Sequence, residues 1–421
     1  MQVLINRNYR YRIYPNKHQI DLLNQHFFTS NQAYNFFLDS KIKDLKANAD
    51  LPKADRNYKK FADSYIDVKN SLASRKLSYN SGVIQDSMRK LELISKRFFS
   101  KKSEGYGFPK FKSSRLNEQS FIIRNQATSW TSDCLKIFRQ DINWKFHRDI
   151  PDGAKFNGGI VKRTSDMKYW VILNLTIEQE YVDLDTGREC GIDMNIKNIA
   201  ISDSSGSSYQ IKLPDFSKSK YSKTYNKVKT QLSKRYLKKN FSKKTKKLQI
   251  KLNRIQQKIK NQKEDFFHKI SNDLTDNHNR ITIEDLKISK MKESDKTHLN
   301  RMISDVSWNS LITKIKYKAE MKNVQVREIN PAFTSQRCNA CGHISRNNRK
   351  SQSDFHCENC DHTENADLNA SKNILQYDNW SLEQKTRWTK SIKSSQVSIE
   401  SNSILLGAVM HQLEVPPFMA G

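Results

Sequence analysis

The amino-acid sequence predicts a multidomain α+β protein that carries a small metal-binding module. The chain has 421 residues, which suits roughly two to four domains better than one. Apolar residues recur at helical spacing between residues 16 and 100, whereas short β-branched segments separated by turn residues follow over residues 119–181. Two CxxC pairs lie between residues 338 and 360, and this spacing is typical of a zinc module.

The charge balance indicates a polyanionic partner. Lys and Arg number 74 against 44 Asp and Glu, so the formal net charge is +30, and nucleic-acid phosphate is the usual match for such an excess. A membrane surface is the alternative, but the sequence has no lipidation motif and no long apolar stretch. The N-terminal apolar run is broken by Asn6 and Arg7, so no signal peptide is expected. Cys134 and Cys190 stand alone, which suits a reducing compartment.

The first 181 residues predict a β domain interrupted by helices. Residues 9–14 alternate basic and apolar side chains like a half-buried strand, which Pro15 ends. Helical patterns run from Asn16 to about residue 100, and glycines and a proline in residues 105–113 break them. Residues 119–181 predict a small antiparallel barrel or sandwich. The helices are therefore expected to be an insertion after the first strand.

The next segments alternate strands with helices. A strand, a turn and a second strand begin at Cys190, further strands are expected at residues 280–288 and 324–330, and a helix at about 305–322. Residues 234–251 carry nine Lys or Arg, and an apolar helical stripe follows. A solvated helix face is the default interpretation of such a run, but its position between two candidate catalytic strands favours nucleic-acid contact. Residues after 380 lack periodicity, so residues 381–421 are expected to be mostly disordered.

The two CxxC pairs predict a closed zinc site. Each CxxC turn points two thiolates at one ion, so two turns complete a tetrahedral site. Such a site has no open coordination position and is structural, not catalytic. His343, His356 and His362 are adjacent but unnecessary as ligands. The four predicted zinc ligands are Cys338, Cys341, Cys357 and Cys360.

Three carboxylates lie in elements that otherwise suit a core. Asp193 is in the strand "GIDMN", Glu284 is in "ITIEDL", and Asp367 opens the helix "ADLNASKNIL". One such residue could be a buried hydrogen bonder, but three of them point to a shared cation site. Magnesium prefers oxygen ligands, and two such ions can support phosphodiester cleavage. The acids that fit less well are Asp203 in a turn, Asp285 on the opposite strand face and Asp305 at a helix cap.

These motifs, in order, resemble the TnpB family of transposon-encoded nucleases, also called the OrfB zinc-ribbon family. The resemblance rests on "GIDMNIKNIAISDSSG", "ITIEDLKISKM", "PAFTSQRCNACG", "FHCENC" and "ADLNASKNIL", with "YRIYPNKHQIDLLNQHF", "YNFFL" and "GFPKFKS" in the N-terminal half. It spans roughly residues 9–376. Miniature type V CRISPR nucleases share the C-terminal motifs, but the "YPNKHQ" and "GFPKFKS" signatures favour TnpB.

The resemblance implies an RNA-guided DNA endonuclease encoded by an insertion-sequence-type transposon. It would cut DNA complementary to its guide, next to a short flanking motif, by metal-dependent hydrolysis. Asp193, Glu284 and Asp367 match the three acidic positions, which would bind Mg²⁺ or Mn²⁺, and the cysteines match the zinc ribbon. Asn195 is a departure, because the family often has glycine there. The implied domains are a β-barrel wedge (1–14 and 119–184), a helical recognition part (15–118), a RuvC-like ribonuclease-H-fold nuclease (185–332 and 363–380) and a zinc ribbon (333–362).

The implied partners are a guide RNA derived from the transposon end and double-stranded target DNA. The protein is expected to act as a monomer with its RNA in the prokaryotic cytoplasm, without a membrane partner. Two competing functions remain: a nuclease-inactive guided repressor, against which the intact acidic triad argues, and a miniature type V CRISPR effector. A strand-joining transposase is disfavoured because no HUH motif or Tyr–His pair is evident. The candidate nucleic-acid contacts are Arg337, Arg346, Lys110 and Lys112.

Overall fold

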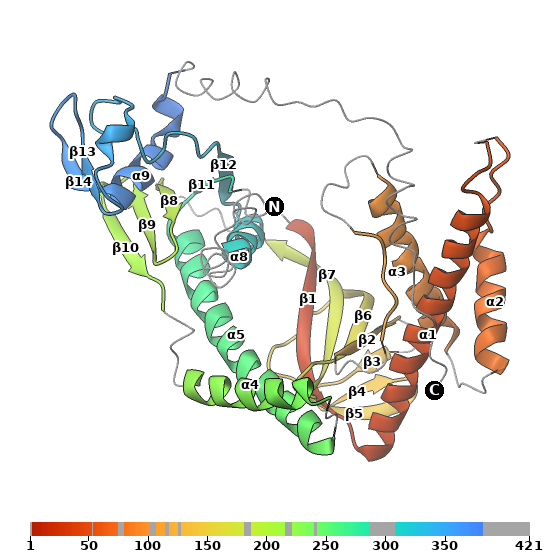
Figure 1. Ribbon diagram of the computed structural model, residues 1–421. Coiled ribbons are helices and arrows are strands. Elements are labelled where there is room, and N and C mark those ends of the chain that lie inside the picture. The colour runs from red at the N-terminus through yellow and green to blue at the C-terminus, as the bar shows by residue number, and fades with distance from the viewer. Residues whose placement is uncertain are drawn as a thin grey trace. The chain divides into compact units, whose positions relative to one another are not determined.

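The protein forms two compact units in the computed structural model (Figure 1). Among the described residues, one unit is built from residues 4–178 and the other from residues 2–3 and 179–381. The predicted cap Asp305 and almost all of the predicted tail lie outside the described residues. None of the described helices is both long and apolar enough to cross a lipid bilayer. The structure describes residues 2–52, 54–74, 80–100, 107–113, 118–124, 128–180, 187–214, 221–239, 242–286 and 308–381.

The N-terminal unit contains a seven-stranded sheet in the order β2-β6-β7-β1-β5-β4-β3. The first strand lies between β7 and β5, so it pairs with segments more than a hundred residues away, as the interrupted β domain predicts. The strands are β1 (Gln2–Tyr14), β2 (Gln119–Ile123), β3 (Thr128–Trp130), β4 (Cys134–Ile137), β5 (Gln140–Lys145), β6 (Lys155–Arg163) and β7 (Tyr169–Glu180).

This sheet curls around one core. Alternate residues of β1, Tyr9, Tyr11 and Ile13, are buried in it together with side chains from the other strands. Trp130 on edge strand β3 contacts Phe156 on β6, with ring centroids 5.3 Å apart. The edges β2 and β3 are not paired with each other in the described residues, so full closure as a barrel stays a prediction.

Three helices follow β1 and precede β2, which confirms the predicted insertion. They are α1 (Lys17–Ala47), α2 (Phe61–Ser74) and α3 (Ser81–Phe99). Asn16 begins α1 with a capping box, because its side chain accepts from the Gln19 amide while its own amide donates to the Gln19 side chain. The helices share a core that includes Phe37, Leu72 and Met88.

The C-terminal unit contains a five-stranded sheet in the order β10-β9-β8-β11-β12. Strands β8, β9 and β10 are antiparallel neighbours, whereas β8, β11 and β12 run parallel. The strands are β8 (Glu189–Met194), β9 (Asn198–Asp203), β10 (Ser208–Lys212), β11 (Arg280–Glu284) and β12 (Gln325–Ile329).

Helices cover both faces of this sheet (Figure 1). Cys190 and Ile192 of β8 share a core with α5 (Lys243–Asn277) and α8 (Trp308–Met321). The alternate residue Gly191 faces α9 (Ala366–Leu375) on the other side. A Cβ at Gly191 would lie 2.3 Å from the Leu375 amide nitrogen, so only glycine allows α9 to pack this closely.

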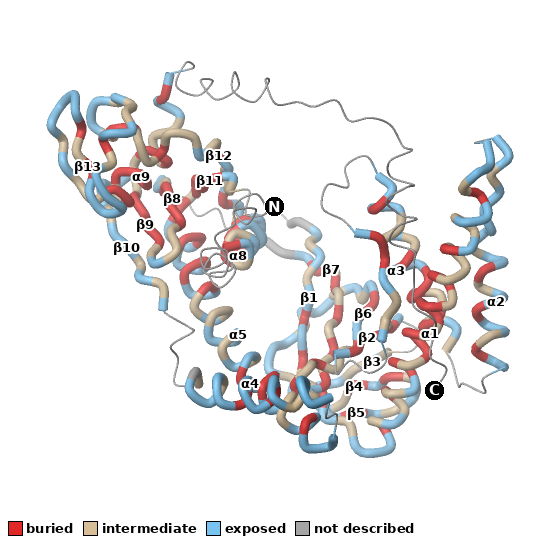
Figure 2. The backbone as a smooth tube through the Cα atoms, in the orientation of Figure 1, coloured by how far each residue is buried: buried red, intermediate tan, exposed pale blue. Residues whose placement is uncertain are grey.

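Two smaller features complete this unit. Helix α4 (Ser222–Leu237) packs against α5 through an apolar seam of Val228, Leu232 and Leu252, while most of its surface is exposed (Figure 2). A two-stranded antiparallel sheet of β13 (Asp354–His356) and β14 (Thr363–Asn365) lies just before α9, within the module that carries the four cysteines.

Candidate functional site

The three predicted carboxylates come from neighbouring elements of the C-terminal unit. Asp193 is near the end of β8 and Glu284 ends β11, and the pairing of Ile192 with Ile283 brings the two acids to the same edge of the sheet. Asp367 is in the first turn of α9, on the sheet face that Asp193 shares with Gly191. All three are buried, with 8%, 8% and 6% exposure.

Each carboxylate accepts a hydrogen bond from a neutral side chain. These bonds hold one oxygen of each carboxylate in place. Sequence reasoning missed all three donors as parts of the site, because each bond depends on tertiary packing or on the turn after β8. The bonds run from Asn195 Nδ2 to Asp193 Oδ2 (2.8 Å), from Thr334 Oγ1 to Glu284 Oε1 (2.6 Å) and from Asn198 Nδ2 to Asp367 Oδ2 (3.0 Å).

The electrostatics of the site favour an added cation. Burial, with a contribution from the charge of Asp367, raises the pKa of Asp193 to about 6. Burial and the charge of Asp193 raise the pKa of Glu284 to about 7, although the Thr334 hydrogen bond opposes this rise. Both shifts mean that the ionised site is short of positive charge. An all-oxygen donor set of this kind fits a hard cation such as Mg²⁺ or Mn²⁺.

Arg349 supplies the one cation that the described residues place against this site. Its Nη2 lies 3.4 Å from Asp367 Oδ1, and its charge lowers the pKa of Asp193. Backbone carbonyls of Ser351 and Gln352 hold the guanidinium. No spacing rule identifies this arginine from sequence, because it reaches α9 from the cysteine-bearing module.

The four cysteines gather as predicted. Their sulfur atoms all lie within 4.8 Å of one another, so they can hold one zinc ion. In the described part of the chain no other set of three or more Cys, His, Asp or Glu is as close. The acidic oxygens are therefore set wider apart than the ligands of one small ion. The histidines stay outside the thiol cluster, as expected.

The two cysteine turns repeat one local geometry. The amides of Cys338 and Cys357 each donate to the carbonyl five residues on, at 2.9 Å. The residue after each second cysteine has positive φ: Gly342 at 78° and Asp361 at 53°. Glycine adopts this conformation without strain, and aspartate tolerates it.

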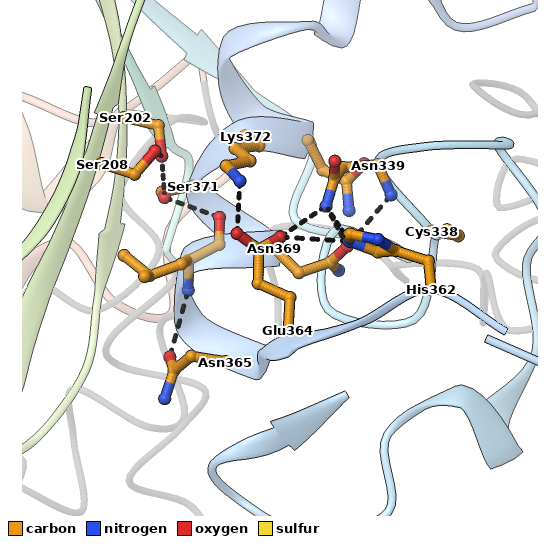
Figure 3. A network of polar contacts seen from close by, with 12 residues as sticks. Ser202, Ser208, Cys338, Asn339, His362, Glu364, Asn365, Asn369, Ser371 and Lys372 are labelled. Carbon is orange, nitrogen blue, oxygen red and sulfur yellow. Dashed lines mark hydrogen bonds and ion pairs between the residues drawn. The ribbon is translucent and has the colours of Figure 1, made fainter. Parts of the chain in front are cut away.

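A part-buried polar network joins the first cysteine turn to α9 (Figure 3). The Asn339 amide nitrogen donates to Asn369 Oδ1 at 3.0 Å, and its side chain donates to Glu364 Oε2 at 2.7 Å. On the sheet side of α9, the hydroxyls of Ser371 and Ser202 are hydrogen-bonded at 2.6 Å. The helix that carries Asp367 is thus fixed to both the metal module and the sheet.

Arg337 needs a correction as a predicted phosphate contact. Its side chain is buried, donates to Asn373 Oδ1 at 3.0 Å and lies over the Trp380 ring. It therefore fixes the module to α9 and does not face solvent. Lys112 is half-buried against the Tyr34 ring, and burial lowers its pKa to about 8.

The remaining predicted contacts and an unforeseen groove lie at the surface. Arg346 and Lys110 are exposed.

In the N-terminal unit, a polar groove of about 1240 Å³ follows the N-terminus of α3 and the neighbouring strands. Asp86 is the acid that lines it, and Arg124 is bonded to this carboxylate. The basic side chains lining the groove are Arg89, Arg124, Lys136, Arg139 and Lys155.

Comparisons with known proteins place the chain among transposon-encoded proteins. Residues 174–295 match the OrfB_IS605 family model described as "Probable transposase", and residues 308–374 match "Cas12f1-like, TNB domain". Residues 1–50 match the "Helix-turn-helix domain" model of the same OrfB family, although the structure shows β1 and the single helix α1 over residues 2–47.

The similar proteins agree with these models. The chain is 30% identical over 332 residues to the Escherichia coli K12 protein named "Putative RNA-guided DNA endonuclease InsQ", covering 76% of this chain and 80% of that one. It is 34% identical over 131 residues to a TnpB-like protein of Methanocaldococcus jannaschii, covering 30% and 28%. A Cas12f1–sgRNA–target DNA complex contains a chain of similar fold, with TM-score 0.54, 15% identity and coverage of 85% and 83%.

The fold thus belongs to a class of multidomain α+β proteins with a four-cysteine module. Within that class, the chain belongs to the TnpB family, also known as the OrfB proteins of IS605-type transposons.

Proposed function

We infer that the protein is an RNA-guided DNA endonuclease, and that Asp193, Glu284 and Asp367 form its cleavage centre. The observation that carries this proposal is the convergence of three buried carboxylates at one edge of a sheet, with too little positive charge around them. A relative of similar length is named for the same activity. The guide RNA and double-stranded target DNA are the proposed partners, and they match the net charge of +30.

The sheet topology supports a ribonuclease-H-like, RuvC-type nuclease domain. In chain order the strands lie 3-2-1-4-5, with the first three antiparallel and the last two parallel to the first. This arrangement puts the ends of β8 and β11 side by side. A helix that crosses that edge can then supply a third ligand, and α9 does so. We assign residues 185–332 and 363–380 to this domain, and the seven-stranded sheet with its inserted helices to the wedge and recognition parts.

The site's own residues perform positioning and charge stabilisation. Two Mg²⁺ or Mn²⁺ ions, when bound by the three carboxylates, would activate a water and stabilise the leaving oxygen of a phosphodiester. Asn195 and Thr334 orient the carboxylates before the metal arrives, so fewer side-chain conformations are lost on binding. Arg349 brings a fixed guanidinium to the same place, where it can neutralise charge that builds on the scissile phosphate.

The four-cysteine module acts as a structural zinc ribbon in this proposal. The four sulfur atoms would fill all four coordination positions of one tetrahedral zinc ion, so the zinc would have no open position for a substrate or water. The module carries Arg349 and is bonded to α9 through Asn339 and Asn369. The ribbon therefore shapes the mouth of the cleavage centre, and Arg349 is the side chain by which it reaches the acidic site.

Asp193→Ala tests the proposal against a matched control. The change removes a metal ligand but no basic surface, so cleavage of a guide-matched plasmid should fall by orders of magnitude while target binding in a gel shift persists. Asp285→Ala is the control, because Asp285 is exposed and follows Glu284 directly. If Asp193→Ala cuts as fast as wild type, the three acids are structural and cleavage takes place elsewhere. If neither protein cuts while both bind the target, the guided-binder function replaces this one.

A further inference from the structure

The α4–α5 helical hairpin concentrates much of the positive charge of the protein. Residues 221–263 contain sixteen Lys or Arg and no Asp or Glu. This segment alone holds just over half of the net charge of +30. Fourteen of the sixteen are lysines, which act as point charges and not as planar forks for base edges. The composition therefore suits contact with a charged backbone more than recognition of a sequence.

One face of α5 presents a straight row of these charges, which we call the basic stripe. Successive members are four, four, three and four residues apart, so they share one helix face. Fifteen residues of helix rise about 22 Å. Every member of the stripe is exposed. The basic stripe consists of Lys243, Lys247, Lys251, Arg254 and Lys258.

The packing of the hairpin leaves most of this face open, and among the residues that the structure describes only Lys258 of the stripe contacts the other arm, where it lies over the Tyr221 ring at 5.1 Å. Val228 and Leu232 of α4 meet Leu252 of α5, so the apolar seam is used inside the hairpin. The stripe lies on a different side of α5 from that seam, because helical residues advance by about 100° each. Within the described residues, no ion pair joins a stripe side chain to a carboxylate, and Glu264, the first acid after the stripe, pairs with Lys314.

A merely solvated helix face does not explain the stripe well. Exposed helices gain stability from Glu and Lys four residues apart, whereas like charges at that spacing repel. The stripe contains three such like-charged pairs: Lys243 with Lys247, Lys247 with Lys251, and Arg254 with Lys258. The repulsion is relieved when a polyanion lies along the row. A permanent partner relieves it more completely than a transient one.

We propose that the basic stripe binds the phosphate backbone of a duplex segment of the guide RNA, independently of its sequence. Protein contacts to RNA duplexes are made mostly to shape and phosphates, which an even row of lysines can provide. The choice of RNA rests on the proposed function, in which the guide stays bound before and after the target. The stripe is separate from the acidic site, so its role does not require cleavage.

Replacing four stripe lysines by glutamine tests this proposal in the full-length protein. The variant changes Lys243, Lys247, Lys251 and Lys258. The probe is a 20-base-pair RNA duplex of arbitrary sequence, and Kd is measured across a range of salt concentrations. Each lost phosphate contact lowers the slope of log Kd against log salt by about 0.7–0.9, so the slope should fall by roughly 3. At 100 mM salt the variant should bind at least about tenfold more weakly.

A second set of four lysines provides a control with the same loss of charge. Each of these exposed lysines is paired with a carboxylate, so it is not expected to contact phosphate. Changing all four to glutamine should leave the salt slope close to wild type. The control lysines are Lys43, Lys96, Lys269 and Lys316.

Three results would overturn the proposal: equal slopes for the two variants, a loss of binding to a DNA duplex but not to the RNA duplex, or a stripe variant that no longer folds by circular dichroism. The last result counts because removal of repelling charges should preserve α5. Asp193→Ala separates this proposal from the proposed function, since it should bind the RNA duplex like wild type. Failure of the cleavage hypothesis would leave the salt slopes unchanged.

Discussion

Replacing Glu284 by glutamine should stabilise the magnesium-free protein at high pH. Burial and the nearby charge of Asp193 raise the pKa of Glu284 from 4.5 to about 7. The unfolded chain releases this proton at lower pH than the folded one, so the stability of the folded protein falls as pH rises from about 4.5 to about 7. Above about pH 7 the folded protein bears the full free-energy cost of holding a buried, ionised Glu284. Glutamine is uncharged and avoids this cost, and its side-chain oxygen can still accept the hydrogen bond from Thr334.

The expected gain in stability follows from the pKa shift of Glu284. One pKa unit corresponds to about 1.4 kcal/mol, which suggests about 2–3 kcal/mol for Glu284 after allowance for its coupling to Asp193. In a unit of this size each kcal/mol moves Tm by about 2–4 °C. The Tm of Glu284→Gln in magnesium-free buffer at pH 8.5 should therefore exceed that of wild type by roughly 4–12 °C. At pH 5 the two Tm values should converge, because wild-type Glu284 is then protonated.

Differential scanning fluorimetry at the two pH values gives the measurement. Glu328→Gln is the control, because Glu328 is an exposed carboxylate on β12 paired with Lys316 at 2.7 Å, and its loss should move the free energy of unfolding by at most about 1 kcal/mol. Added Mg²⁺ should raise the Tm of wild type at pH 8.5 more than that of Glu284→Gln. A lower Tm for Glu284→Gln at pH 8.5 would show that the charged form is structurally required, and the reasoning would be refuted.

Three further outcomes follow from the site. Cys357→Ser should lose the zinc measured by elemental analysis, about one ion per chain, and lose cleavage with it, whereas metal-free yet fully active protein would contradict the ribbon's role. Asn195→Gly should keep cleavage but need several-fold more Mg²⁺ for half-maximal rate, with weaker Mn²⁺ binding by calorimetry, because Asp193 loses the bond that orients it. Gly191→Ala should cost about 3 kcal/mol or more in stability, measured as a fall in Tm, because its Cβ would meet α9 backbone at 2.3 Å.

The features that sequence predicted best are those encoded by local spacing. The CxxC turns fix the direction of two thiols each, and the four sulfurs do meet. The carboxylates stood out because an acid inside an apolar strand is costly without a partner. The helical insertion was predicted from a change in apolar spacing, from helical over residues 16–100 to strand-like over residues 119–181. This local pattern does not depend on how the elements later pack together. In α9, Ala366, Ala370 and Ile374 recur at helical spacing and are buried on one face.

The features that sequence missed depend on contacts between distant segments. Asn198 bonds Asp367 across 169 positions of chain, and Thr334 bonds Glu284 across fifty. Asparagine and threonine are common in turns, so neither residue type signals such a role. Arg337 shows the opposite error, since its position beside a zinc ligand suggested a surface cation, whereas its side chain is buried against Trp380.

Helix α9 explains why the ribbon and the cleavage centre must be considered together. Asp367 faces the acidic site, Asn369 holds the first cysteine turn, and Ser371 is bonded to the sheet. With these three side chains on a ten-residue helix, a shift of the ribbon moves the carboxylate and Arg349 as well. Loss of zinc should therefore disable cleavage through displacement of Asp367, although no cysteine contacts the acidic residues. The ribbon is best understood as part of the support that preorganises the site.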